Sequence, residues 1–229
     1  MAVIKLNIGA AITRIPGFVN IDISSVAELS LDLNKDPLPF ENDSVDLVFS
    51  YHTLEHVEHY IFALGEIHRV LRHGGRFLLG VPYVTSTELN LVNPYHKQHF
   101  SERSFDFFDA TRAKGGAGEE NAVLFRKVFH RFHHCGMFHI LPPPLKTWSR
   151  RHLFNVVKKI DFGLVAIKDR SMPIEVSRDL VRSMQTEFQE CMDARVPYNQ
   201  DSRNFRRTSS TTLKNRLRRL KMWWNGTDE

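Results

Sequence analysis

Short apolar runs and one longer helical pattern alternate along the first half of the chain. Runs rich in β-branched and aromatic side chains occur at 4–8, 18–23, 44–51 and 76–81, with a weaker one at 28–33. Residues 57–72 place Ile61, Leu64 and Ile67 at three-residue steps, which predicts an amphipathic helix ended by Gly74 and Gly75. Strands joined through a crossover helix predict an α/β fold, with a Rossmann-like, doubly wound, mostly parallel sheet flanked by helices.

The second half of the chain gives a weaker pattern. Its predicted elements are a helix that begins at Ser101, a helix over 148–160, a strand over 162–167 and a helix over 177–192. An aromatic and histidine-rich stretch covers 125–140, and three consecutive prolines at 142–144 interrupt any regular element. We therefore expect a Rossmann-like domain over 1–200 with a divergent C-terminal half, followed by a tail over 201–229.

Composition narrows the class of protein. The 229 residues are 42% hydrophobic and 25% charged, which is typical of a globular chain. No stretch approaches the ~20 uncharged apolar residues of a membrane span, and the first residues resemble a strand rather than a signal peptide. Cys135 and Cys191 form no disulfide framework, so both are expected to be free thiols in a reducing compartment. These features predict a cytoplasmic protein.

The basic character of the chain is concentrated in its tail. Eight lysines and arginines and no acid lie between Arg203 and Lys221, whereas residues 1–202 carry 23 bases and 24 acids. The apolar residues that recur there at helical spacing are Leu213, Leu217, Leu220 and Trp224. This pattern predicts a basic amphipathic helix that contacts a membrane surface, which would place the protein peripherally at the inner membrane face. Docking on its own body or on a second copy in a homo-oligomer is the alternative, and nucleic acid is disfavoured because the body is nearly neutral.

Small residues and two acids follow the predicted strands at positions suited to a nucleotide-containing cofactor. The turn at 7–11, Asn-Ile-Gly-Ala-Ala, allows a ligand to approach the backbone closely. Asp22 ends the second run and can accept from both hydroxyls of a ribose, and Asp32 is placed to accept from an adenine amino group. The sequence therefore predicts a cofactor site at the carboxyl edge of the sheet.

Six pieces of sequence, taken in order, carry a resemblance to a known family. They are Leu-Asn-Ile-Gly at 6–9, Pro-Gly-Phe-Val-Asn-Ile-Asp at 16–22, Leu-Pro-Phe with Asn-Asp-Ser-Val-Asp at 38–46, Leu-Glu-His at 54–56, Arg-Val-Leu-Arg-His-Gly-Gly at 69–75 and Asn-Pro-Tyr-His-Lys-Gln-His-Phe at 93–100. Over residues 5–108 the chain resembles class I S-adenosylmethionine-dependent methyltransferases, and within them the type 11 branch associated with surface-glycan biosynthesis. The resemblance implies methyl transfer from S-adenosylmethionine to a hydroxyl of a glycan or lipid-linked sugar, with another small-molecule acceptor as the alternative.

The resemblance and the strand ends together imply the residues of the site. The expected cofactor-binding residues are Asn7, Gly9, Ala10, Ala11, Asp22, Asp32, Leu33, Ser50, Tyr51 and His52. A sugar hydroxyl is a poor nucleophile at neutral pH and benefits from a general base, for which His52 and His96 are the candidates. Glu55 is expected to orient the base or to replace it. His96 lies in the segment expected near the acceptor, and stabilisation of a loop is its alternative role.

Two histidine-containing patterns resemble metal sites, and we expect no metal at either. His-Thr-Leu-Glu-His at 52–56 matches the inverted zinc-protease motif, but it directly follows a predicted strand, whereas a zinc site needs both histidines within a helix. The second pattern consists of His130, His133, His134, Cys135 and His139. Its spacings match no closed zinc site, so packing is the preferred interpretation.

Two features depart from the family pattern. Ala11 stands where the family has its second glycine, and its methyl group would crowd the cofactor if the position needs a positive φ. The interval from Gly9 to Asp22 leaves room for little more than one helical turn. Both features favour an alternative function, in which the chain is a non-catalytic, degenerate methyltransferase scaffold that serves as a partner subunit.

Overall fold

The computed structural model describes residues 3–109, 111–112 and 122–198, so the tail predicted over 201–229 lies outside the described residues. The chain divides into two units, Met1–Arg195 and Val196–Glu229. In the second unit the described residues hold the two-residue strand β9 (Val196–Pro197). All the other elements belong to the first unit.

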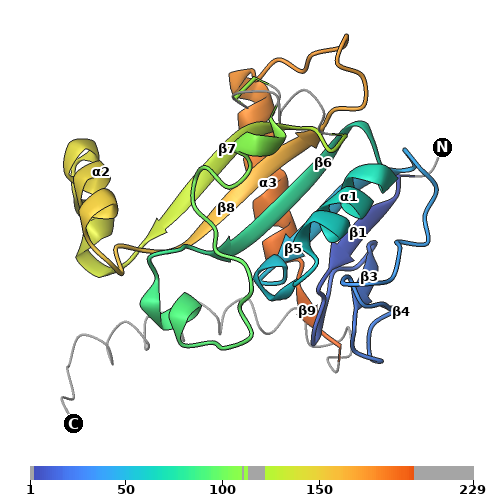
Figure 1. Cartoon of the computed structure of the whole chain (residues 1–229), viewed down its shortest axis with the longest axis horizontal. Helices are drawn as coiled ribbons and strands as arrows, with labels where there is room; N and C mark the ends of the chain where they lie inside the picture. Colours follow the sequence, from blue (N-terminus) through green and yellow to red (C-terminus); the bar gives the residue numbers. More distant parts are fainter. Residues whose placement is uncertain (1–2, 110, 113–121, 199–229) are drawn as a thin grey trace. The chain divides into compact units, whose positions relative to one another are not determined.

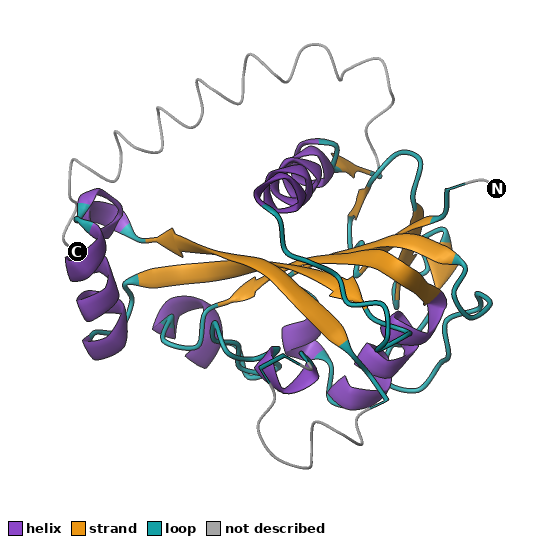
Figure 2. Cartoon of the chain, turned by 90° about the horizontal axis from the view of Figure 1, so that it is seen from above, coloured by secondary structure: helices purple, strands orange, loops and turns teal. Residues whose placement is uncertain are grey.

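A seven-stranded sheet with helices on both faces forms the first unit (Figures 1 and 2). Its strands are β1 (Lys5–Ile8), β3 (Val19–Asp22), β4 (Leu29–Ser30), β5 (Val45–Tyr51), β6 (Leu71–Pro82), β7 (Phe125–His134) and β8 (Val157–Ala166), and β2 (Thr13–Arg14) lies outside this sheet. The helices are α1 (Tyr60–Val70), α2 (Pro143–His152) and α3 (Arg178–Asp193), and the short helical turns are η1 (Leu54–His56), η2 (Thr87–Leu91), η3 (Asp106–Phe108) and η5 (Gly136–Ile140).

The order of the strands is β4-β3-β1-β5-β6-β8-β7. The pairs from β4 to β6 are parallel, whereas β8 runs antiparallel to both β6 and β7. This topology confirms the predicted Rossmann-like, mostly parallel sheet and its divergent C-terminal half. It also brings the carboxyl ends of β1, β3, β4 and β5 to one edge, where ligands bind in sheets of this kind.

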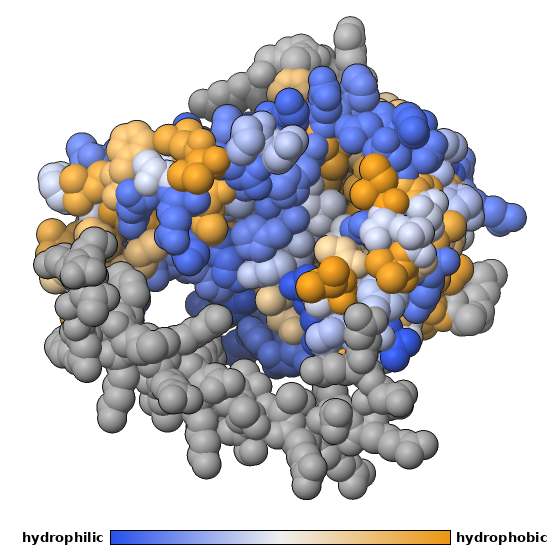
Figure 3. Space-filling view, turned by 90° about the horizontal axis from the view of Figure 1, so that it is seen from below, coloured by the Kyte–Doolittle hydropathy of each residue, from blue (hydrophilic) through white to orange (hydrophobic). Residues whose placement is uncertain are grey.

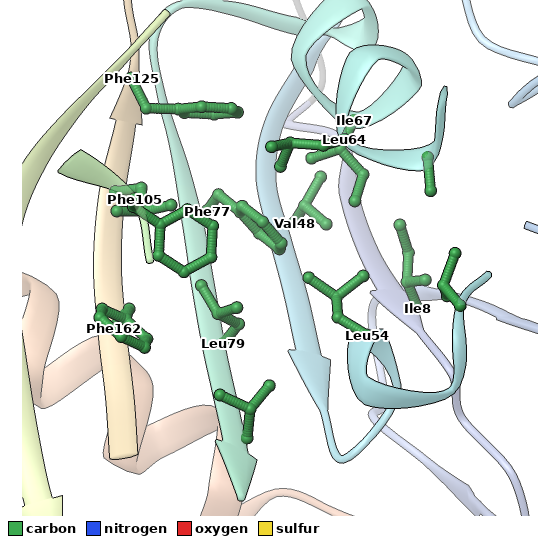
Figure 4. Packing of buried hydrophobic residues seen from close by; sticks show 14 of the residues in the cluster. Ile8, Val48, Leu54, Leu64, Ile67, Phe77, Leu79, Phe105, Phe125 and Phe162 are labelled. Atoms are coloured by element: carbon green, nitrogen blue, oxygen red, sulfur yellow. The ribbon is translucent and has the colours of Figure 1, made fainter. Parts of the chain in front are cut away.

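The face of the sheet beneath α1 carries the larger hydrophobic core (Figure 4). Leu64 and Ile67 of α1 are fully buried and pack in one cluster with Ile8, Val48 and Phe77 of the central strands. Because parallel strands are covered on both faces, most residues of β1 and β5 are buried rather than every second one, and the polar Asn7 and Ser50 are among them. The apolar spacing that predicted α1 thus arises because one face of this helix packs against the core.

Helix α3 covers the opposite face of the sheet, as Figure 2 shows. Ser177 caps the helix by accepting a hydrogen bond from the Leu180 N–H at 3.1 Å, which satisfies one of the free donors of the first turn. Met184 and Phe188 are buried against this face, and the Phe188 ring meets Phe49 of β5 edge-on with centroids 5.6 Å apart. The helix predicted over 177–192 is therefore present, and it covers the face of the sheet opposite α1.

Three helices differ in the structure from what the sequence predicted. The helix expected over 57–72 begins only at Tyr60 and ends at Val70, and Gly74 and Gly75 lie within β6, since pairing with β5 continues the chain as a strand. The helix expected over 148–160 combines the end of α2 with the start of β8. Where a helix was expected to begin at Ser101, η3 is a single short turn. In each case strand pairing or packing overrode a local helical pattern.

Within the described residues, no helix is both long enough and apolar enough to cross a membrane.

Candidate active site

A cavity of about 400 Å³ opens at the carboxyl edge of the parallel strands. Its lining comes from the ends of β1, β3, β4 and β5 and from the segments that follow them, and consists of Gly9, Ala11, Ile21, Asp22, Ile23, Leu31, Asp32, Leu33, Asn34, His52, Thr53, His56 and Val57. This volume falls in the range of pockets that bury a small organic ligand. We call it the first cavity.

The turn after β1 has left-handed backbone conformations at Gly9 and Ala11. Gly9 adopts φ +75°, and a Cβ added there would lie 1.8 Å from the Thr53 Oγ1, so only glycine fits beneath this side chain. Ala11 adopts φ +50°, the left-handed conformation that a second glycine would take without strain. The Ala11 N–H donates to the Asp22 Oδ2 at 2.8 Å, and this bond stabilises the strained turn.

Two carboxylates face the first cavity, as the sequence predicted. Asp22 accepts from the N–H groups of Ala11 and Ser24, one on each oxygen, and each oxygen keeps a second lone pair for a ligand hydroxyl. Asp32 follows β4, and a hydrogen bond from the Asn34 N–H lowers its pKa below the ordinary value. Both groups are therefore hydrogen-bond acceptors fixed in position before any ligand binds.

Asn34 fixes the shape of the first cavity from the other side. Its Oδ1 accepts from the N–H groups of Glu58 and His59 at 2.8 and 3.1 Å, which joins the segment after β4 to the segment before α1. These residues lie 24 and 25 positions apart in the chain. The cavity wall is thus held by a long-range contact as well as by the sheet.

A second cavity of about 260 Å³ is lined by several residues with hydrogen-bonding side chains. The residues around it are His52, Glu55, His56, Pro82, Glu88, Leu89, Val92, Asn93 and His96. His52 and His56 line both cavities, so they stand at the boundary between the two. A ligand in each cavity would meet at these histidines.

His52 is paired with a buried carboxylate at this boundary. Its Nδ1 lies 3.0 Å from the Glu55 Oε1, and the Glu55 side chain is 1% exposed, against 33% for His52. His52 also has φ +54°, an uncommon backbone conformation for a non-glycine residue, which occurs preferentially at functional sites. When Nδ1–H donates to Glu55, the other ring nitrogen, Nε2, is left with a lone pair that can accept a proton.

His96 completes the cluster from a distant part of the chain. Its ring meets His56 edge-on with centroids 4.6 Å apart, and its buried Nδ1 has no hydrogen-bond partner among the described residues. Burial lowers the pKa of His96 below the ordinary value, and the neighbouring His56 acts in the same direction. His96 is therefore a neutral imidazole near pH 7, with a nitrogen available to a ligand.

The described residues contain one group of donors that could hold a metal ion. Ligand atoms of Glu55, His56 and His96 lie within 4.8 Å of one another, and carboxylate with imidazole is a donor set that zinc accepts. The sequence predicted no metal here because the motif at 52–56 directly follows a strand, and it did not indicate that the distant His96 lies beside that motif. The same side chains can equally donate to and accept from the hydroxyl groups of a ligand.

Four residues expected to bind the cofactor do not line the first cavity. Asn7 is buried and donates to the Asn20 Oδ1 at 2.9 Å, and the Ala10 and Ser50 side chains are also buried within the fold. Tyr51 points to the face covered by α3, where its hydroxyl accepts from the Lys159 Nζ at 2.7 Å. Because successive side chains of a strand alternate between faces, residues at one strand end cannot all reach one cavity.

The other expected residues meet at the two cavities. Gly9, Ala11, Asp22, Asp32, Leu33 and His52 line the first cavity, and His52, Glu55 and His96 line the second. Residues that the sequence did not indicate for the first cavity include Asn34, Thr53 and Val57, and for the second Glu88 and Asn93. Asn34 and Asn93 lie two and three positions along the chain from Asp32 and His96, and this nearness in sequence was the one signal that could have indicated them.

Comparisons with known proteins bear on the fold and on the kind of domain. Residues 19–79 match a family described as methyltransferase domain, whereas no curated protein matches the chain. A crystal structure of an S-adenosylmethionine-dependent methyltransferase from Archaeoglobus fulgidus is 13% identical, covers 72% of this chain and 86% of its own, and has a TM-score of 0.50. The YcgJ protein from Bacillus subtilis is 14% identical over 72% of this chain and 92% of its own, with a TM-score of 0.45. The Archaeoglobus fulgidus structure shows the fold, and the family match shows similarity to a methyltransferase domain over residues 19–79.

The cofactor of a methyltransferase domain of this type is S-adenosylmethionine, and the first cavity fits it. Asp22 and Asp32 offer acceptors for the ribose hydroxyls and the adenine amino group, and Leu31, Leu33 and Val57 offer apolar walls for the base. The strained turn at Gly9 and Ala11 offers backbone groups to the methionine part of the cofactor. The residues present therefore offer hydrogen-bond acceptors to the ribose and the adenine amino group, and an apolar surface to the adenine ring.

Proposed function

We propose that this protein transfers the methyl group of S-adenosylmethionine to a hydroxyl of a glycan or lipid-linked sugar. The observation that carries the proposal is the pair of adjoining cavities with the His52–Glu55 pair at their boundary. The lining of the second cavity is rich in hydrogen-bonding side chains, which suits a polyhydroxylated acceptor better than an apolar one. Glu88, Asn93 and His96 supply both donors and acceptors for such a ligand.

The chain's own residues supply positioning and proton removal. The bound cofactor provides an electrophilic methyl group on a sulfonium, and the protein must hold the acceptor oxygen in line with it. His52 accepts the hydroxyl proton at Nε2, and Glu55 holds the ring in the required tautomer and stabilises the imidazolium that forms. His56 and His96, whose rings are in contact, also line the second cavity and hydrogen-bond the acceptor there.

Two measurements test this function in order. Calorimetry with S-adenosylmethionine measures binding to the first cavity, and labelled methyl transfer is then measured on free sugars, lipid-linked sugars and small non-sugar alcohols. We expect cofactor binding and transfer to a sugar acceptor. Transfer only to non-sugar alcohols would show that the acceptor is not a sugar, although the protein would still be a methyltransferase.

A non-catalytic scaffold is the second candidate function. It is favoured by the connection from β1 to β3, all of it described, which holds the two-residue strand β2 and no helix. The strain at Ala11 also favours the scaffold, because a non-glycine residue with a positive φ destabilises the turn that would contact the cofactor. Absence of binding at about millimolar cofactor would support the scaffold and end the enzyme proposal.

The basic tail, whose structure lies outside the described residues, is proposed to hold the enzyme at an anionic membrane that carries a lipid-linked acceptor. Its support is the sequence pattern of one apolar face between cations. Replacing Leu217 and Trp224 by serine in the full chain should lower binding to anionic vesicles. Unchanged binding would leave docking on the body or on a second copy as the tail's role.

A further inference from the structure

One surface of the described protein combines exposed apolar side chains with cations, and none of its residues lines either cavity. It is formed by the connection between β7 and β8, which holds η5 and α2 beyond the ends of the two strands (Figure 1). The exposed residues of this connection include the large apolar side chains Met137, Ile140, Leu145, Trp148, Leu153 and Phe154. Figure 3 shows hydrophobic residues gathered at the same end of the molecule.

The orientation of α2 is fixed by its inner side. Ser149 is buried, and the Arg150 guanidinium lies over the Phe132 ring, 4.4 Å from its centroid, and pairs with the Glu102 carboxylate. At about 100° per residue, Leu145 and Trp148 lie on the side of the helix away from Arg150. Their side chains are 50% and 54% exposed, so two large apolar groups remain in water on a helix that cannot turn them inward.

The chain segment that carries these apolar groups has charges of one sign. Residues 122–160 contain eight lysines and arginines, five histidines and no acid. Of these bases, Arg151 and Lys158 are exposed, and Arg151 follows Trp148 at a spacing of three on the outer side of α2. An occupant of this surface must therefore be both anionic and able to accept apolar side chains.

We infer that the outer side of α2, together with η5, is a docking surface for an anionic lipid membrane. Leu145, Trp148 and Phe154 would insert among the acyl chains near the headgroups, and Arg151 and Lys158 would bind the lipid phosphates. A second copy of the chain would bring like charges together, and the basic tail carries the same charge as the surface. Nucleic acid is anionic but offers no apolar phase for aliphatic side chains such as those of Ile140 and Leu145.

The test uses the full chain and vesicles of phosphatidylcholine with or without phosphatidylglycerol. Binding is expected only with the anionic lipid and should weaken as salt is added. The pair Arg151→Gln and Lys158→Gln should lower the partition coefficient about 25-fold, from about 5-fold for each charge. The pair Leu145→Ser and Trp148→Ser should lower it by at least about 10-fold.

Matched controls come from other surfaces of the same protein. Arg178→Gln with Arg182→Gln removes two exposed cations from α3, and Ile61→Ser removes an exposed apolar residue from α1 that is 63% exposed. Neither control should change vesicle binding. Thermal melting of every variant establishes that each one is folded.

Tryptophan fluorescence locates the contact independently of the tail. When Trp223 and Trp224 are replaced by phenylalanine, Trp148 is the single tryptophan left in the chain. Its emission should shift to the blue when anionic vesicles are added. Vesicle binding with no shift, equal binding by the α2 variants, or a loss in the controls as large as in those variants would overturn the inference. An α2-dependent dimer, or binding to an oligonucleotide instead of vesicles, would also overturn it.

Discussion

Replacing Glu55 by glutamine tests the pair on which the proposed chemistry depends. Glutamine has nearly the same shape and can still accept from the His52 Nδ1–H, so the change removes a charge and little else. The charge matters only when His52 becomes an imidazolium, which happens as it takes the proton of the acceptor. The variant should therefore lower kcat and leave cofactor affinity unchanged, because Glu55 does not line the first cavity.

The size of this effect follows from the geometry. Two unit charges 3.0 Å apart, the distance between the Nδ1 and Oε1 atoms, attract by about 5 kcal/mol at an effective dielectric constant of about 20. The His52 side chain is 33% exposed, so solvent screening reduces the attraction to about 3 kcal/mol. A loss of this size in the transition state corresponds to a decrease in kcat of about 10²-fold.

Steady-state methyl transfer measures kcat, and calorimetry measures cofactor affinity in the same preparation. Glu41→Gln is the matched control, because it removes an exposed carboxylate that lines neither cavity. The double variant His52→Gln with Glu55→Gln should be no slower than His52→Gln alone, since Glu55 acts through His52. An unchanged kcat in Glu55→Gln, or a parallel loss of cofactor affinity, would refute the assigned role of the pair.

Three further predictions follow from the same structure. Asp22→Ala should weaken S-adenosylmethionine binding by about 2 to 3 kcal/mol, as for the loss of a charged hydrogen-bonding group, and calorimetry that shows unchanged affinity would contradict the ribose assignment. Gly9→Ala should destabilise the fold by about 2 kcal/mol or more in urea unfolding, because its new Cβ would overlap the Thr53 side chain at a positive φ, and Thr53→Gly in the same chain should recover part of the loss. Burial lowers the pKa of His68, so the unfolded chain binds this proton more readily than the folded one. The free energy of unfolding should therefore be steady above pH about 6.5 and fall as the pH drops below it, and His68→Gln should flatten that fall in urea titrations at successive pH values.

The sequence by itself determined the parallel half of the sheet and the edge at which the site forms. Continuous apolar runs such as that of β5 can be buried only between two layers, and the amphipathic spacing of α1 supplies one of these layers. Because parallel strands end at a common edge, Asp22, Asp32 and His52 had to come together there. Local chemistry also fixed the turn at Gly9, since few other residues adopt its φ.

Only the tertiary structure decided which side chains meet. Tyr51 and His52 are neighbours in the chain, yet one contacts Lys159 on the α3 face and the other lines both cavities, since side-chain direction depends on register and on the φ of His52. His56 and His96 are far apart in sequence, and their contact needs the whole connection after β6 to be folded. The outward position of Trp148 likewise follows from how α2 packs, because a helical pattern gives spacing along one segment and carries no information about the surface it will meet.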